Sequence, residues 1–202
     1  MAHPRVVSSD PASPKLRRAV TWAAALNLAW FVVEFGVARA IGSVSLFADS
    51  IDFLEDASVN GLILLGLGWG PRRRGVLGLA LAGVLLVPAI ATIWAAWGKL
   101  VSPTPPAGLP LAWTALGALA INAICAFRLA SVRHAAGSLS RAAFLSARND
   151  VLANVAMIAA GLITLLWPSA WPDLVVGLGI LAMNLDAARE VYRAARAELH
   201  PA

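Results

Sequence analysis

Six long apolar stretches take up almost the whole chain and restrict its possible folds to those of membrane proteins. They run roughly over residues 18–40, 44–69, 75–99, 108–131, 142–167 and 173–194. Each is close to the ~20 residues that an α-helix needs to cross a bilayer. None shows the alternation of polar and apolar residues that a membrane β-barrel strand requires. The sequence therefore predicts an all-α, polytopic membrane protein with six transmembrane helices.

The composition excludes an ordinary soluble domain. Of the 202 residues, 59% are hydrophobic and 13% are charged, whereas soluble domains are usually about 25% charged. We expect one membrane domain over residues 18–198, because the flanking segments 1–17 and 199–202 are too short to fold alone. The first is expected to be a cytoplasmic tail, and the second a short tail without a cytoplasmic C-terminal domain.

Basic residues are distributed unequally between the two ends of the predicted helices. Thirteen of the 16 Lys and Arg residues lie before the first stretch, at or after the end of the last, or around the links after the second and fourth. The opposite side has only Arg39 and Lys99, and Arg148 lies inside the fifth stretch. Because cytoplasmic loops carry an excess of Lys and Arg, both termini are predicted to be cytoplasmic. This distribution relates the net charge of +5 to membrane topology rather than to nucleic acid, and the Ala- and Arg-rich composition favours a bacterial inner membrane.

Four carboxylates interrupt the second apolar stretch: Asp49, Asp52, Glu55 and Asp56. Charge in hydrocarbon is costly, so a membrane helix rarely carries it without a function. On a helix, Asp52 and Asp56 are one turn apart on the same face, and Asp49 joins them there. Asn60 extends this face by one more turn. Like charges on one face repel one another unless a cation or protons lie between them, so the pattern predicts that something positive binds here.

The fifth stretch has a similar polar face, formed by Ser146, Asp150 and Asn154 at intervals of four residues. If the second and fifth helices pack together, two polar side chains from each converge on one site: Asp52, Asp56, Asp150 and Ser146. Four ligands from two helices can hold a divalent metal ion. Three carboxylates exceed the charge of a 2+ ion, so the empty site should retain protons that the metal expels. This is a physical basis for metal–proton exchange.

The first stretch also carries polar side chains, Asn27 and Glu34, which are seven residues apart and so share a face. The turn around residues 40–43 is short, which predicts a tight antiparallel hairpin of the first two helices. Glu34 and Asp49 then lie at similar depths near the outer rim. Two roles stay open for Glu34: a structural hydrogen bond to a neighbouring helix, or a direct part in transport.

The sixth stretch begins at Trp171-Pro172-Asp173, where Asp173 is expected to be a charge at a helix N-terminus. Gly177 and Gly179 favour close packing against another helix. The single Cys125 lies in a predicted span and has no partner for an internal disulfide, so we expect a packing residue.

Two runs of the chain resemble helices of a known transporter family. Gly42-Ser-Val-Ser-Leu-Phe-Ala-Asp49-Ser-Ile-Asp52-Phe-Leu-Glu-Asp56 is similar to the second helix of the cation diffusion facilitators. That helix has a Gly-Ser-x-(Ser/Ala)-Leu-x-x-Asp lead followed by (His/Asp)-x-x-x-Asp. Residues 141–154 resemble the family's fifth helix, which carries (His/Asp)-x-x-x-Asp again. The resemblance covers roughly residues 16–198.

The resemblance implies a six-helix fold, efflux of Zn2+ or a related ion (Mn2+, Fe2+, Co2+ or Cd2+), proton antiport and often a homodimer. By position, Asp52, Asp56 and Asp150 fall on three of the family's four metal ligands. The fourth, usually His or Asp, is Ser146 here. A neutral hydroxyl is a weak ligand, which shifts the preference toward harder ions such as Mn2+ or Fe2+. A water molecule or Asp49 is the alternative fourth ligand.

We therefore expect a divalent-cation exporter of the cell membrane and not an enzyme. A His-Glu-x-x-His motif is absent and no nucleophile–base pair is visible. No cofactor is expected, and the divalent metal ion is the transported substrate. Expected partners are the metal ion, protons and the lipid bilayer, with a homodimer as one option. The alternative is a non-transporting or degenerate family member that acts as a membrane assembly partner, which the substitution at Ser146 motivates.

Overall fold

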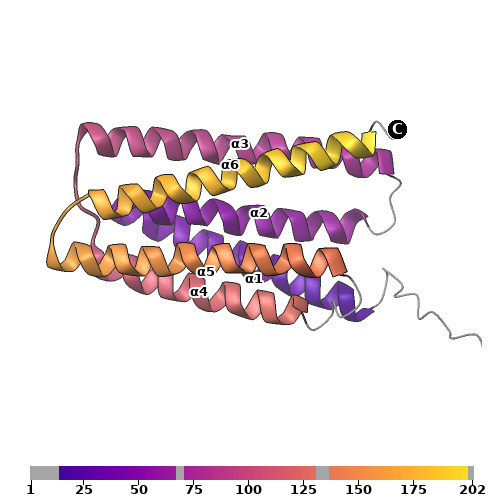
Figure 1. Cartoon of the computed structure of the whole chain (residues 1–202), viewed down its shortest axis with the longest axis horizontal. Coiled ribbons are helices and arrows are strands. Elements are labelled where there is room, and N and C mark those ends of the chain that lie inside the picture. Colours follow the sequence, from indigo (N-terminus) through magenta and orange to yellow (C-terminus); the bar gives the residue numbers. More distant parts are fainter. Residues whose placement is uncertain (1–13, 67–70, 131–136, 200–202) are drawn as a thin grey trace, which may run out of the picture.

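The computed structural model is an antiparallel bundle of long helices (Figure 1). It describes residues 14–66, 71–130 and 137–199; at part of these, including 80–88, 128–130, 137–149 and 194–199, only the backbone is described. Six helices and no strand occur in these ranges: α1 (Pro14–Ile41), α2 (Val44–Gly66), α3 (Pro71–Val101), α4 (Gly108–Ala130), α5 (Gly137–Leu166) and α6 (Trp171–Leu199). The predicted all-α class is confirmed, and each helix contains most of one predicted stretch.

The bundle exposes apolar side chains and buries polar ones. Trp94, Phe127 and Leu166 are 78%, 79% and 89% exposed, whereas Glu34 and Asp49 are fully buried. A soluble protein almost never buries an unpaired acid, and large apolar patches on its surface are rare. The distribution fits a protein whose surroundings are lipid.

Two helical segments in the described ranges are long and apolar enough to cross a membrane: Arg17–Ile41 in α1 and Gly108–Phe127 in α4. Shorter apolar segments, Ala89–Val101 and Asp150–Leu166, lie in α3 and α5. In α2 the apolar sequence is interrupted by its four acids. These segments fit an α-helical membrane domain, while six crossings and cytoplasmic termini stay predictions.

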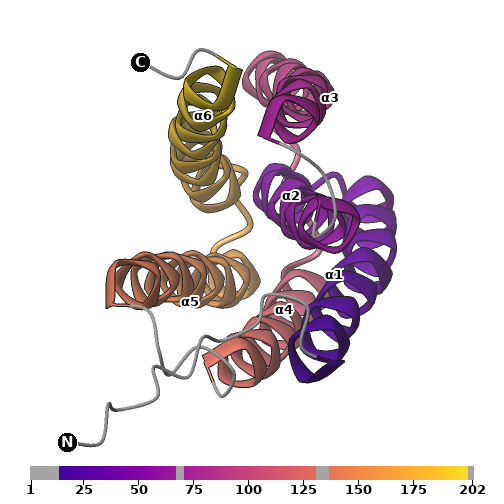
Figure 2. The same cartoon turned by 90° about the vertical axis from the view of Figure 1, so that its right-hand side faces the viewer.

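Helix α2 has the most neighbours in the bundle. It packs against α1, α3 and α6, and touches α4 and α5 only slightly. Helix α5 packs mainly against α4, and α3 packs mainly against α6. Seen along the bundle, α2 lies between α1, α3 and α6, while α5 lies beside α4 (Figure 2). The acids of α2 therefore lie inside the bundle, on a helix held from three sides.

The turn between α1 and α2 depends on Gly42, whose φ of 65° is favourable only for glycine. The Ser43 N–H donates to the Ala38 carbonyl at 3.0 Å, which closes the C-terminus of α1. Because Val44 already begins α2, the two helices run back along each other, as the short turn predicted.

Two close helix crossings rely on the absence of a side chain. A Cβ on Gly108 of α4 would lie 2.5 Å from the Gly161 carbonyl oxygen of α5, and a Cβ on Gly177 of α6 would lie 2.8 Å from the Val44 carbonyl carbon. The predicted packing role is therefore confirmed for Gly177. It is wrong for Gly179, because no heavy atom lies within 4 Å of a Cβ placed there.

Candidate metal site

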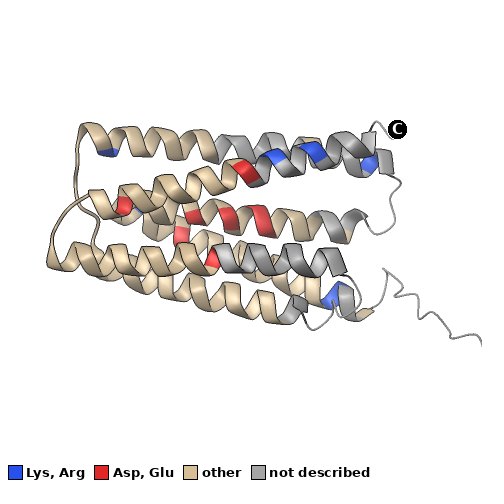
Figure 3. Ribbon diagram, in the orientation of Figure 1, with Lys and Arg blue, Asp and Glu red and all other residues tan. Residues whose placement is uncertain are grey.

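Acidic residues follow one another along α2 in the middle of the bundle, and others occur on the helices around it (Figure 3). On α2, Asp49 is buried and Asp52, Glu55 and Asp56 are half-buried. The helical spacing of these residues places the three aspartates along one face, as predicted. The acids lie close enough together for the charges of Asp49, Glu55 and Asp56 to act on Asp52.

Asp56 is the acid of α2 that the neighbouring helices hold most directly. The Asn27 amide of α1 donates to Asp56 Oδ2 at 3.3 Å. The Cys125 thiol of α4 contacts Asn27 Oδ1 at 3.5 Å, so Cys125 supports this amide as well as packing in the core. Asn60 points to its own helix instead, and donates to the Asp56 backbone carbonyl at 2.8 Å. The predicted extension of the polar face to Asn60 therefore adds no ligand to it.

Asp150 of α5 lies close enough to the acids of α2 for their charges to interact. Its side chain is half-buried, and its charge interacts with those of Asp56, Asp49 and Glu55 and of Asp52. Asp150 thus lies within electrostatic range of the α2 acids, and its role as a metal ligand stays a prediction. The Asn154 amide donates to the Asp150 backbone carbonyl at 2.7 Å, so Asn154 stabilises α5 rather than the acid group.

The acids are neighbours but do not form a closed coordination shell. Among the side chains that the structure describes, no three His, Cys, Asp or Glu residues come close enough together to hold one metal ion. The reason lies in the packing, because α5 rests on α4 and barely contacts α2. The Ser146 and Arg148 side chains lie outside the described residues, so the fourth ligand stays a prediction.

Glu34 and Asp49 meet across the α1–α2 hairpin. Both are buried, and their carboxyl groups lie within hydrogen-bonding reach of each other. No described donor reaches either oxygen of Glu34 or Oδ2 of Asp49. The prediction that these two acids share a depth is confirmed. One carboxyl group of the pair, if protonated, can donate to the other, so a structural hydrogen bond and a part in transport both stay open for Glu34.

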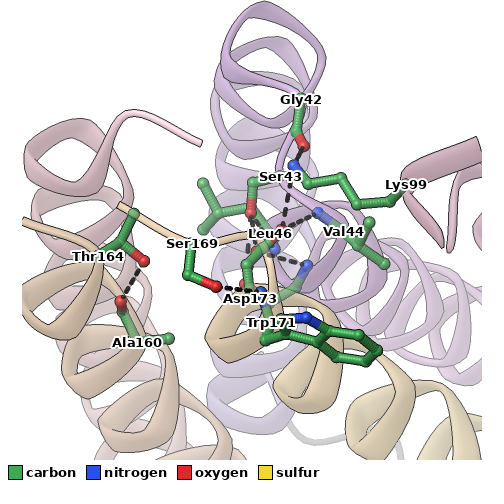
Figure 4. Close-up of polar contacts among 11 residues, drawn as sticks. Gly42, Ser43, Val44, Leu46, Lys99, Ala160, Thr164, Ser169, Trp171 and Asp173 are labelled. Atoms are coloured by element: carbon green, nitrogen blue, oxygen red, sulfur yellow. Dashed lines mark hydrogen bonds and ion pairs between the residues drawn. The ribbon is translucent and has the colours of Figure 1, made fainter. Parts of the chain in front are cut away.

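A second polar cluster lies at the N-terminus of α2, around Asp173 of α6 (Figure 4). Asp173 Oδ1 accepts bonds of 2.6 Å from Ser43 Oγ and 2.6 Å from Ser45 Oγ, and Oδ2 accepts one of 2.8 Å from the Val44 N–H. Lys99 Nζ of α3 lies 3.6 Å from Asp173 Oδ2 and also donates to the Gly42 carbonyl.

Asp173 lies in the first turn of α6, as predicted. Its larger role was missed from the sequence, because it also caps the N-terminus of α2. The sequence did contain a signal for this cap. Ser43 and Ser45 lie at the start of α2, whose first turn has no acidic residue of its own, so an acid from another helix can bind there. A groove of about 240 Å³ lies beside this cluster and is lined by the basic side chains of Arg39 and Lys99, which suits no metal cation.

A lipid-facing helix bundle that buries a group of acids defines a class of protein, the membrane transporters of cations. Comparison with known families makes this specific: the chain matches the cation efflux transmembrane domain over residues 20–200. The chain belongs to the cation efflux family, which confirms the resemblance seen in its second and fifth helices. No curated protein shows a significant match to the chain as a whole.

Proposed function

We propose that this member of the cation efflux family exports a divalent metal cation from the cytoplasm in exchange for protons. The proposal is carried by a group of acids inside the bundle, Asp52 and Asp56 on α2 and Asp150 on α5, whose charges act on one another. Acids inside a membrane domain that have no basic partner are expected to bind a cation or protons. Within the described ranges, the ion pair of the structure joins Lys99 to Asp173 and involves none of the three proposed ligands.

The proposed ligands are Asp52, Asp56 and Asp150, with Ser146 as the fourth. Three carboxylates offer oxygen donors to Zn2+ and suit harder ions such as Mn2+ and Fe2+ still better. Asn27 donates to Asp56 Oδ2 and leaves its other oxygen for the metal. Such an outer hydrogen bond orients a carboxylate ligand.

Proton exchange follows from the charge of this ligand set. Without metal, three ionised carboxylates would repel one another in a medium of low dielectric constant, so protons must occupy part of the site. Metal binding needs deprotonated ligands and therefore releases those protons. Protons that enter from the outside would in turn expel the metal.

The distribution of basic residues supports the direction and the topology. Arg17 and Arg73 lie in the first turns of α1 and α3, and Arg193 lies near the C-terminus of α6, whereas Arg39 and Lys99 lie in the last turns of α1 and α3. On the positive-inside rule, the first group marks the cytoplasmic end and places both termini there after six crossings. A bacterial inner membrane is the location we propose.

Metal flux into sealed vesicles that contain the purified protein tests the proposal. The variants Asp52→Asn and Asp150→Asn should each abolish the uptake of Zn2+ and Mn2+ and the accompanying proton movement. Asp186→Asn is the matched control, because Asp186 is an exposed aspartate of α6. Unchanged transport in both site variants would refute the assignment.

One observation favours a second candidate, a non-transporting family member that serves as a membrane assembly partner. The three acids do not close around a single point in the described structure, and Ser146 replaces a stronger ligand. Calorimetry on the purified protein separates the two candidates. Binding of a divalent ion that is clearly weakened in Asp52→Asn supports transport, whereas a folded protein that binds none supports the assembly role.

A further inference from the structure

Two fully buried carboxylates outside the proposed ligand set have no donor to satisfy them. Glu34 of α1 is 0% exposed and Asp49 of α2 is 1% exposed. Both oxygens of Glu34 and Oδ2 of Asp49 lack a hydrogen-bond partner among the described residues. A buried ionised carboxylate without compensation is very costly, so this pair must hold either a cation or protons.

The chemistry of the pair indicates which partner fits. Two ionised carboxylates carry two negative charges and present up to four oxygens, which are ligands that divalent cations accept. A divalent ion between Glu34 and Asp49 gives a neutral complex. One shared proton would leave a net negative charge in a medium of low dielectric constant, whereas two protons, one on each carboxyl group, also give a neutral pair. Protons therefore occupy the pair when the metal is elsewhere, and metal binding displaces them.

The position of the pair relates it to the proposed site. Asp49 precedes Asp52 by three residues, which is ~4.5 Å along a helix, in the direction of the α1–α2 turn. The charge of Asp49 acts on both Asp52 and Asp150. The charge of Asp52 in turn acts on Glu34, so electrostatic interactions link the pair to the proposed ligands.

We propose that Glu34 and Asp49 form a second station for the transported divalent cation, one step outward from Asp52, Asp56 and Asp150. The inference rests on the proposed function, because it assigns these two acids to the exit path of the same ion. The inner station has three carboxylates and the outer has two, so the ion is held less tightly as it moves outward. Two divalent ions this close repel strongly, and a single ion therefore moves between the stations.

Calorimetry with Zn2+ and Mn2+ on the full chain in lipid nanodiscs tests the outer station directly. In the double variant Asp52→Asn/Asp150→Asn, we expect one binding event to remain, about tenfold or more weaker than in the wild type. Adding Glu34→Gln should remove it, because glutamine keeps the shape of the side chain but loses the charge. No residual binding, or residual binding that survives Glu34→Gln, would overturn the inference.

Transport provides the second readout. Glu34→Gln alone should keep metal binding at the inner station and lower vesicle flux about tenfold or more, while Glu34→Asp should restore part of the flux. Thr164→Val is the control for folding, since Thr164 is buried on α5 and bonds only within its own helix. A wild type without flux contradicts the proposed function. A wild type with flux that Glu34→Gln leaves unchanged contradicts the outer station alone.

Discussion

Asp173 is the residue whose loss should most destabilise the described fold, and Asp173→Ala is the perturbation we develop. Its carboxylate is 0% exposed and accepts bonds from Ser43 Oγ, Ser45 Oγ and two backbone N–H groups at the start of α2. It also pairs with Lys99, which is only 6% exposed. One side chain thus joins α6, α2 and α3.

The size of the effect follows from these partners. Hydrogen bonds to a charged group contribute about 1.5–3 kcal/mol each, and removing one member of a buried ion pair costs about 3–5 kcal/mol. These contributions are not additive, because they share one carboxylate. We therefore expect Asp173→Ala to lower the free energy of unfolding by about 4 kcal/mol.

Reversible unfolding in mixed micelles, followed by the helical circular dichroism signal, measures this change. Asp186→Ala, on the exposed surface of the same helix, should change stability by less than about 0.5 kcal/mol. In the double variant Asp173→Ala/Lys99→Met the buried ammonium is also removed, so it should recover part of the loss. A loss below about 1 kcal/mol in Asp173→Ala, or no recovery in the double variant, would refute the reasoning.

Three further predictions concern single positions. Gly177→Ala should destabilise the protein by about 1–3 kcal/mol, because its Cβ would meet the α2 backbone. Gly179→Ala should have little effect, and thermal unfolding of both variants measures the difference. Asn27→Ala removes the bond that orients Asp56, and should weaken Zn2+ binding about 10–100-fold by calorimetry with little change in folding. Ser146→Asp adds a carboxylate at the proposed fourth ligand, and a rise in Mn2+ affinity would support that position while an unchanged affinity would contradict it.

Local features of the sequence predicted what depends on local structure. The apolar stretches predicted all of the helices, because a continuous run of such residues in lipid has no other way to satisfy its backbone. The meeting of Glu34 and Asp49 followed from a turn too short to shift one helix along the other. The four-residue spacing of Asp52 and Asp56 alone placed these two acids on one face of α2.

Contacts between distant segments could not be read in the same way. Asp173 caps a helix that begins 129 residues earlier in the chain, and no periodicity connects the two. Gly177 and Gly179 look equivalent in the sequence, but only one of them faces α2. The distance between α2 and α5 depends on helix tilt, which the length of an apolar stretch does not determine. Homodimer formation also stays a prediction, because it depends on contacts between distant segments that no sequence pattern specifies.

The separation of α5 from α2 indicates which part of the proposed site adjusts when metal binds. Helix α2 is fixed by Asp173 at its start and by Asn184 of α6, which donates to the Ala48 carbonyl at 3.2 Å. Helix α5 has α4 as its main partner, and the two are packed closely through Gly108 and Gly161.

Because α5 packs mainly on α4 and touches α2 only slightly, it is the helix of the proposed site that is least fixed to α2. Metal binding should therefore draw α5 toward α2, so that Asp150 completes the shell with Asp52 and Asp56. Spin labels on the exposed positions Ile93 of α3 and Val155 of α5 should come closer when Zn2+ is added, and the change should vanish in Asp150→Asn. An unchanged distance in a protein that binds Zn2+ would show that the ion is held without this movement.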